Sequence, residues 1–116
     1  MRHALIIDDN LIISRAIRSR LEAFGFDSFD HTWAEQQAID AAEARTPDLI
    51  VVGDTMSKGS PIEVAEKLAR SNDAPVLMVT TDRFMLQSRL PERAVVDGPY
   101  ALSELDAALG SIKVHG

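Results

Sequence analysis

The 116-residue chain contains no cysteine, which excludes disulfide bonds, thiolate catalysis and cysteine-ligated zinc. It also lacks any apolar run near the ~20 residues that a membrane-spanning helix needs. The apolar run at residues 4–7 is too short for the core of a signal peptide, and two aspartates follow it. We therefore expect a soluble cytoplasmic protein that makes no use of a membrane.

Positive charge is scarce, since 12 lysines and arginines stand against 18 aspartates and glutamates, for a net charge of −6. A chain of this charge repels phosphate-rich surfaces, so we expect no nucleic acid among its partners. The three histidines are scattered and lack metal-ligand spacing. The length and the 46% hydrophobic content fit one globular domain over residues 1–116, with no output domain after it.

Short apolar runs alternate with helical patterns along the whole chain. The apolar runs predict five strands, at residues 4–7, 26–29, 49–52, 76–79 and 94–96. The helical patterns predict helices at residues 13–24, 32–44, 61–70, 82–90 and 102–112. This alternation predicts an α/β fold of the flavodoxin-like (βα)5 type, a doubly wound five-stranded parallel sheet with strand order 2-1-3-4-5.

Two helix starts carry capping signals. Thr32 and Glu35 have the spacing of a capping box, so we expect Thr32 to cap the second helix. Ser60, Pro61 and Glu63 combine a cap residue, a first-turn proline and a capping-box glutamate, which predicts that the third helix starts there.

The carboxyl ends of the strands are where such a sheet binds ligands. Asp8 and Asp9 follow the first strand, and adjacent carboxylates in this position predict a Mg²⁺ site, to which Asp54 after the third strand could contribute. The alternative is that Asp8 and Asp9 only cap the first helix and favour its dipole. Their spacing alone favours the capping role.

Four segments, at residues 6–10, 47–52, 75–80 and 99–100, together resemble receiver domains of two-component response regulators, and the resemblance covers nearly the whole chain. It implies an acidic pair that binds Mg²⁺, an aspartate after the third strand that accepts a phosphoryl group, a hydroxyl residue ending the fourth strand, and a lysine before the proline that follows the fifth. By this resemblance Asp8 and Asp9 are the acidic pair, and Thr80 is the switch hydroxyl.

The phosphoacceptor position departs from the family pattern. Counting without gaps from Pro47 places it at Gly53, which has no nucleophile, while Met56 and Glu63 fall where the family usually has Met and Glu. A bulge at Gly53 could instead turn Asp54 inward as an acceptor or Mg²⁺ ligand. The ungapped register favours Gly53 at the acceptor position.

The lysine position also departs from the pattern, because Gly98 precedes Pro99. Phosphoryl transfer depends on positioned cations, so we expect slow or absent phosphorylation. Without that cation, we expect the acidic residues either to bind Mg²⁺ weakly or to include a carboxyl group with a raised pKa.

Partner surfaces are predicted at two places. Arg15 and Arg18 share one face of the first helix, which by default is a solvated face but in receivers often meets a histidine kinase or phosphotransfer protein. Phe84 and Tyr100 lie near the face where receivers dock partners or a second copy, although filling the core is the simpler role for large apolar residues. A homodimer stays open, and Trp33 fits either a core or an exposed position.

The leading hypothesis is a stand-alone, non-enzymatic degenerate receiver that acts in two-component signalling by binding other proteins. A conventional single-domain response regulator phosphorylated at Asp54 with Mg²⁺ is the first alternative. A phosphatase of the haloacid-dehalogenase type is the weakest, because it needs a second aspartate two residues after Asp8, where this chain has Asn10.

Overall fold

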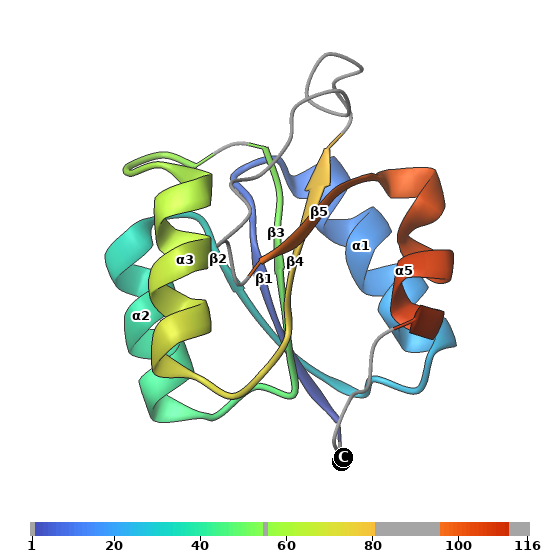
Figure 1. The fold of residues 1–116 in the computed structure, drawn as a ribbon, viewed down its shortest axis with the longest axis horizontal. Helices are drawn as coiled ribbons and strands as arrows, with labels where there is room; N and C mark the ends of the chain where they lie inside the picture. The colour runs from blue at the N-terminus through green and yellow to red at the C-terminus, as the bar shows by residue number, and fades with distance from the viewer. Residues whose placement is uncertain (1, 55, 81–95, 112–116) are drawn as a thin grey trace.

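The computed structural model describes residues 2–54, 56–80 and 96–111, and in it five parallel strands form one sheet (Figure 1). The strand order is β2-β1-β3-β4-β5, which confirms the predicted fold and topology. The strands are β1 (His3–Ile7), β2 (Ser28–Thr32), β3 (Leu49–Val52), β4 (Val76–Thr80) and β5 (Asp97–Ala101).

Helices cover both faces of the sheet. One face carries α1 (Leu11–Ala23) and α5 (Leu105–Ser111), the latter preceded by the short 3₁₀ helix η1 (Leu102–Glu104), and the opposite face carries α2 (Glu35–Ala44) and α3 (Pro61–Ser71) (Figure 1). The helix predicted at residues 82–90 lies outside the described residues. No helix in the described part is long and apolar enough to cross a bilayer.

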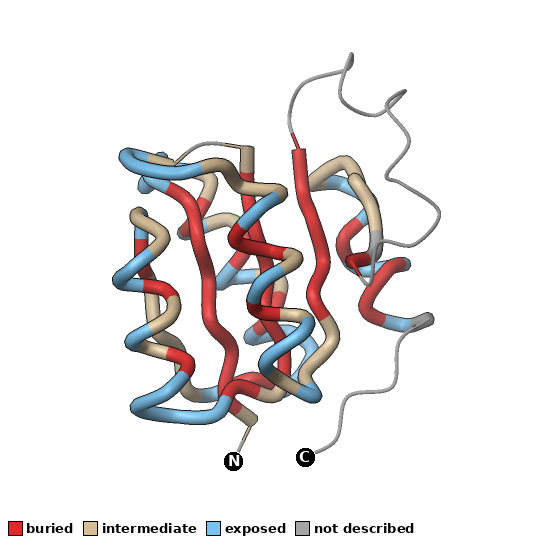
Figure 2. Tube along the Cα trace, turned by 60° about the vertical axis from the view of Figure 1, so that its left-hand side comes forward, coloured by how far each residue is buried: buried red, intermediate tan, exposed pale blue. Residues whose placement is uncertain are grey.

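The strand β1 divides its side chains between two apolar layers. Ala4 and Ile6 pack into the cluster under α1 and α5, whereas Leu5 and Ile7 pack into the cluster under α2 and α3. This division follows from the two-residue period of a strand. Because helices cover both faces, every residue of β1, β3 and β4 is buried, as continuous apolar runs predict (Figure 2).

The edge strand β2 lies two to three residues later than predicted. Phe26 is buried, but its backbone N–H bonds to the carbonyl of Leu21 at the end of α1 rather than to a strand. The strand instead consists of Ser28–Thr32, where Asp30 pairs with Leu5 of β1. Pairing with a buried neighbour here outweighs the low strand propensity of polar residues.

The fifth strand was predicted at residues 94–96, and that position is wrong. Val96 precedes β5, residues 94 and 95 lie outside the described part, and the Gly98–Pro99 pair lies within the strand rather than after it. The register against β4 shifts between Leu77 and Val79, opposite this pair. Proline cannot donate to a ladder, and it is tolerated here because β5 is an edge strand.

The predicted capping box at the start of α2 is also wrong. Thr32 ends β2, and its buried hydroxyl has no hydrogen-bond partner among the described residues. The N-cap of α2 is Ala34, and the Glu35 carboxylate binds Lys67 of α3 instead of closing a capping box. At α3 the helix begins at Pro61 as predicted, although the side chain of the preceding serine makes no capping hydrogen bond.

Candidate functional site

The carboxyl ends of β1, β3 and β4 bring three of the predicted site residues to one edge of the sheet. Asp8 follows β1, Gly53 follows β3, and Thr80 ends β4, with β3 lying between the other two strands. Asp8 and Thr80 are buried, with exposed fractions of 1% and 2%. This is the place where parallel sheets of this topology bind ligands.

The pairing of β1 with β3 runs without a break from Ala4 opposite Leu49 to Ile7 opposite Val52. Beyond the last pair, the backbone N–H of Gly53 donates to the carbonyl of Ile7 at 2.8 Å. The ladder therefore continues to Gly53 with no bulge in it. Asp54 is the next residue and is half-buried.

The side chain of Asp8 fills the space beside Gly53. A Cβ atom added to Gly53 would lie 1.7 Å from Oδ2 of Asp8 and 2.6 Å from its Cγ. The other carboxylate oxygen, Oδ1, accepts a hydrogen bond of 2.6 Å from the backbone N–H of Asn10. Any side chain at position 53 therefore requires the Asp8 carboxylate to move.

The backbone of Asp8 is held by neighbours on two elements. Its N–H donates to the carbonyl of Thr32, and its own carbonyl accepts from the Ser14 hydroxyl at 3.3 Å and from Nε2 of His31 at 2.8 Å. Since a carbonyl can only accept, this nitrogen of His31 carries a hydrogen. The same Nε2 atom of His31 lies 2.8 Å from the hydroxyl oxygen of Ser14. Sequence reasoning missed both residues, because they come together only through the register of β2 against β1.

Capping of α1 is performed by Asn10 and not by the two aspartates. Its Oδ1 accepts from the backbone N–H groups of Ile12 at 2.9 Å and Ile13 at 3.3 Å. The expectation that Asp8 and Asp9 cap this helix is therefore wrong. Asn10 also occupies the position where a haloacid-dehalogenase-type phosphatase needs its second aspartate, and here that side chain serves the helix end.

The three acidic residues predicted to bind Mg²⁺ differ in burial, with Asp54 half-buried. Asp8 is buried against Gly53, Asp9 is exposed, and no group of three or more His, Cys, Asp or Glu side chains able to hold a metal occurs within residues 2–54, 56–80 and 96–111. Mg²⁺ requires near-octahedral oxygen ligands, commonly with one or two carboxylates. Weak Mg²⁺ binding by Asp8, Asp9 and Asp54 stays a prediction.

Gly98 has no room for a side chain. Its φ angle is +121°, a conformation that disfavours residues with a Cβ, and an added Cβ would lie 2.6 Å from the backbone oxygen of Met78. The neighbouring Tyr100 lies inside β5, opposite Val79, and is half-buried against the core. The position that the resemblance assigns to a lysine is thus closed by the main chain of β4.

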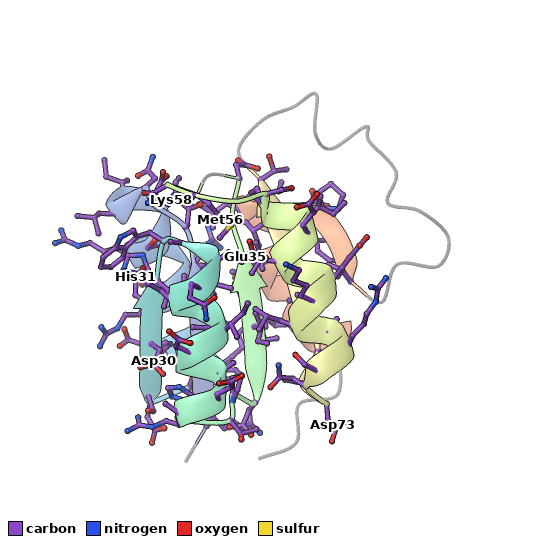
Figure 3. All side chains as sticks on the ribbon, turned by 90° about the vertical axis from the view of Figure 1, so that its left-hand side faces the viewer. Asp30, His31, Glu35, Met56, Lys58 and Asp73 are labelled. Carbon is purple, nitrogen blue, oxygen red and sulfur yellow. The ribbon has the colours of Figure 1, made fainter. Side chains whose placement is uncertain are left out.

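The loop after Gly53 is tied to the end of β2. The Ser57 N–H donates to the carbonyl of Trp33 at 2.8 Å, and the Glu35 N–H donates to the carbonyl of Lys58 at 3.3 Å. Lys67 Nζ donates to the Glu35 carboxylate, and this hydrogen bond raises the pKa of Lys67 above 10.5. Figure 3 shows Glu35 and Lys58 at this junction.

The predicted partner residues lie in different settings. Arg15 and Arg18 are exposed on α1, and the Arg18 guanidinium lies 4.8 Å from the ring centre of Phe29 on β2. Trp33 is 45% exposed and packs edge-on against His31. Phe84 lies outside the described residues.

The family model of the response regulator receiver domain matches residues 4–107 of this chain. Transcriptional regulatory protein PdtaR of Mycobacterium tuberculosis (strain ATCC 25618 / H37Rv) is 27% identical over 115 residues, covering 93% of this chain and 55% of that protein. The probable transcriptional regulator ycf27 of Porphyridium aerugineum is 27% identical over 113 residues, covering 93% and 46%. The chain thus spans about half the length of these curated relatives.

Solved structures agree on the fold. A CheY-like receiver domain from Methanospirillum hungatei JF-1 aligns with a TM-score of 0.75 at 17% identity, covering 95% of this chain and 91% of that one. A chain in the complex of histidine kinase ThkA with response regulator protein TrrA aligns with a TM-score of 0.73 at 19% identity, covering 95% and 97%. With the family match over most of its length, this chain belongs to the response regulator receiver domain family.

Proposed function

We propose that this chain is a degenerate receiver domain of two-component phosphorelay signalling that accepts no phosphoryl group and acts by binding other signalling proteins. The observation that carries the proposal is the Asp8 carboxylate lying where a side chain at Gly53 would begin. By the ungapped count from Pro47, Gly53 falls at the family's phosphoacceptor position, and the ladder of β1 and β3 reaches it without a bulge. The chain therefore presents hydrogen where the family presents a nucleophilic carboxylate.

Transfer of a phosphoryl group to a carboxylate needs a nucleophilic oxygen and cations that neutralise the charge on the transferring oxygens. Gly53 supplies no oxygen, and Gly98 supplies no ammonium group beside it. We infer that the domain signals without chemistry of its own.

Histidine kinases, phosphotransfer proteins and other regulators are the proposed partners. Support comes from the family and from the complex in which TrrA, a protein of the same fold, is bound to histidine kinase ThkA. Arg15 and Arg18 supply an exposed basic strip on α1 that suits an acidic partner surface. A homodimer is a further proposed arrangement, through the face near Tyr100.

The test is a phosphorylation assay read by intact mass. The protein is incubated with Mg²⁺ and acetyl phosphate, in parallel with an active receiver that reports on the donor. We expect no added phosphoryl group on this chain. A stoichiometric adduct that disappears in Asp54→Ala would replace this proposal with a conventional response regulator, an alternative supported by the position of Asp54 directly after Gly53.

A further inference from the structure

A cavity of about 200 Å³ lies between α1 and the edge strand β2. Its polar lining consists of Ser14, Arg15 and Arg18 from α1 and His31 from β2, with the ring of Phe29 as an apolar wall. Figure 3 shows His31 at the end of β2 that lies beside α1. Neither Gly53 nor Gly98 contributes to this lining.

The charge of the cavity is opposite to that of the chain. The protein carries a net charge of −6, yet the side chains that line the cavity include two arginines and a histidine and no carboxylate. Arg15 makes no ion pair or hydrogen bond with the described part of the chain, so its charge is uncompensated there. A local cationic cavity attracts anions even though the protein as a whole is acidic.

Two further groups are already fixed in position. Arg18 stacks over Phe29 and donates through Nε to Glu22 at 3.2 Å, which leaves its terminal nitrogens as donors. The ring of His31 is held through Nε2 by the carbonyl of Asp8, so Nδ1 is its remaining hydrogen-bonding atom. Groups held in place before a ligand arrives lose little freedom on binding.

We propose that this cavity is a binding site for a phosphate group, carried either by a small molecule or by a phosphorylated side chain of a partner. Guanidinium groups match phosphate oxygens with paired hydrogen bonds, so Arg15 and the terminal nitrogens of Arg18 supply the donors for the phosphate. The cavity is several times larger than the ~30 Å³ share of one water molecule, so a tetrahedral oxyanion fits. This site goes beyond the proposed function and does not depend on it.

Titration with inorganic phosphate, followed by ¹H–¹⁵N NMR at constant ionic strength maintained with chloride, tests the proposal. We expect saturable shifts at Ser14, Arg15 and His31. Arg15→Gln should weaken phosphate binding about tenfold, because a charge-assisted contact is lost. Arg70→Gln is the matched control, since it removes the same charge from an exposed position on α3, and it should leave the affinity unchanged.

A second arm of the experiment distinguishes the two sources of the phosphate. The titration is repeated with a short peptide that contains phosphoserine. Tighter binding of the peptide than of inorganic phosphate identifies a phosphorylated side chain as the ligand, and the reverse order identifies a free small molecule. Shifts that never saturate, or equal weakening by Arg15→Gln and Arg70→Gln, overturn the proposal and leave the function proposed above untouched.

Discussion

Gly53 and Gly98 both stand where the receiver pattern requires a functional side chain, but different parts of the molecule close the two positions. At Gly53 the atoms nearest to an added Cβ belong to the side chain of Asp8. At Gly98 they belong to the backbone of Met78 and Tyr100, and φ is +121°. A carboxylate can rotate away, whereas a backbone can yield only by breaking the pairing of β4 with β5.

Under the proposed function, the two glycine positions oppose phosphoryl transfer in different ways. At Gly53 the obstacle is the side chain of Asp8, so a larger residue could be accommodated if that side chain moved. At Gly98, which the resemblance places at the lysine position, the obstacle is the main chain next to the edge strand. We therefore expect that replacing both glycines with the residues of the family pattern would not by itself permit phosphorylation.

The largest effect is expected from Gly98→Lys. The new Cβ meets the Met78 backbone oxygen in a conformation that residues with a Cβ rarely adopt, so we expect a loss of at least about 3 kcal/mol in the free energy of unfolding. Urea denaturation followed by circular dichroism measures it. Gly110→Lys is the control, because nothing lies within 4 Å of a Cβ there. Equal stability of the two variants would mean that β5 does not depend on glycine at this point.

Gly53→Asp should cost less, about 2 kcal/mol, because it displaces a side chain and brings a second carboxylate beside a buried one. If the Asp8 carboxylate is the obstacle, combining the substitution with Asp8→Gly should recover part of the loss. Denaturation of the two single variants and the double variant forms a double-mutant cycle. Purely additive losses would show that something other than Asp8 closes this position.

Strands β1, β3 and β4 could be predicted from the sequence because their continuous apolar runs are buried on both faces. The edge strands could not be placed well. In β2 polar residues are held by pairing with β1, and in β5 an Asp-Gly-Pro segment is held by pairing with β4. The position of an edge strand is determined by its pairing with the neighbouring strand, and its own residue composition predicts that position poorly.

In the candidate site too, some features could be predicted from the sequence and others could not. The ungapped count that favoured Gly53 depends on register, and the ladder between β1 and β3 is continuous up to that residue. The contact between Asp8 and Gly53 could not be foreseen, because it depends on the side-chain direction that the Asn10 N–H imposes on Asp8. The meeting of Ser14 with His31 depends on the edge strand, and no spacing in the sequence indicates it.

Ser14→Ala tests how firmly Asp8 is held against Gly53. The variant removes the hydroxyl that donates to the Asp8 carbonyl, while His31 still binds that carbonyl, so we expect a loss of about 1 kcal/mol. The control is Ser19→Ala, at an exposed position of the same helix. A loss in Ser14→Ala no greater than in this control would contradict the assigned role of the hydroxyl, with thermal melts as the measurement.

The smallest effect on stability is expected at the loop that follows Gly53. Glu35 binds this loop through its backbone N–H, and its carboxylate binds Lys67 of α3. The pKa of Lys67 is raised above 10.5 by its hydrogen bond and charge interaction with Glu35. A raised folded-state pKa contributes stability that is fully present below 10.5 and is lost as the pH rises through the raised value. Lys67→Gln should therefore lower the melting temperature slightly at pH 8, and the difference from wild type should vanish at higher pH.

A control variant is needed to distinguish the loss of the ion pair from the general effect on the melting temperature of removing a positive charge from an acidic protein. Lys58→Gln makes the same change on the fastened loop, where the lysine contributes its backbone carbonyl rather than a salt bridge. Added salt should reduce the Lys67→Gln effect, because both partners of the pair are accessible to solvent ions. If Lys58→Gln shows the same pH and salt dependence, the loop after Gly53 is fastened by its backbone hydrogen bonds alone. In that case the loop after Gly53 is held by main-chain contacts, as the surroundings of Gly98 are, and the side chain of Asp8 is what distinguishes the two glycine positions.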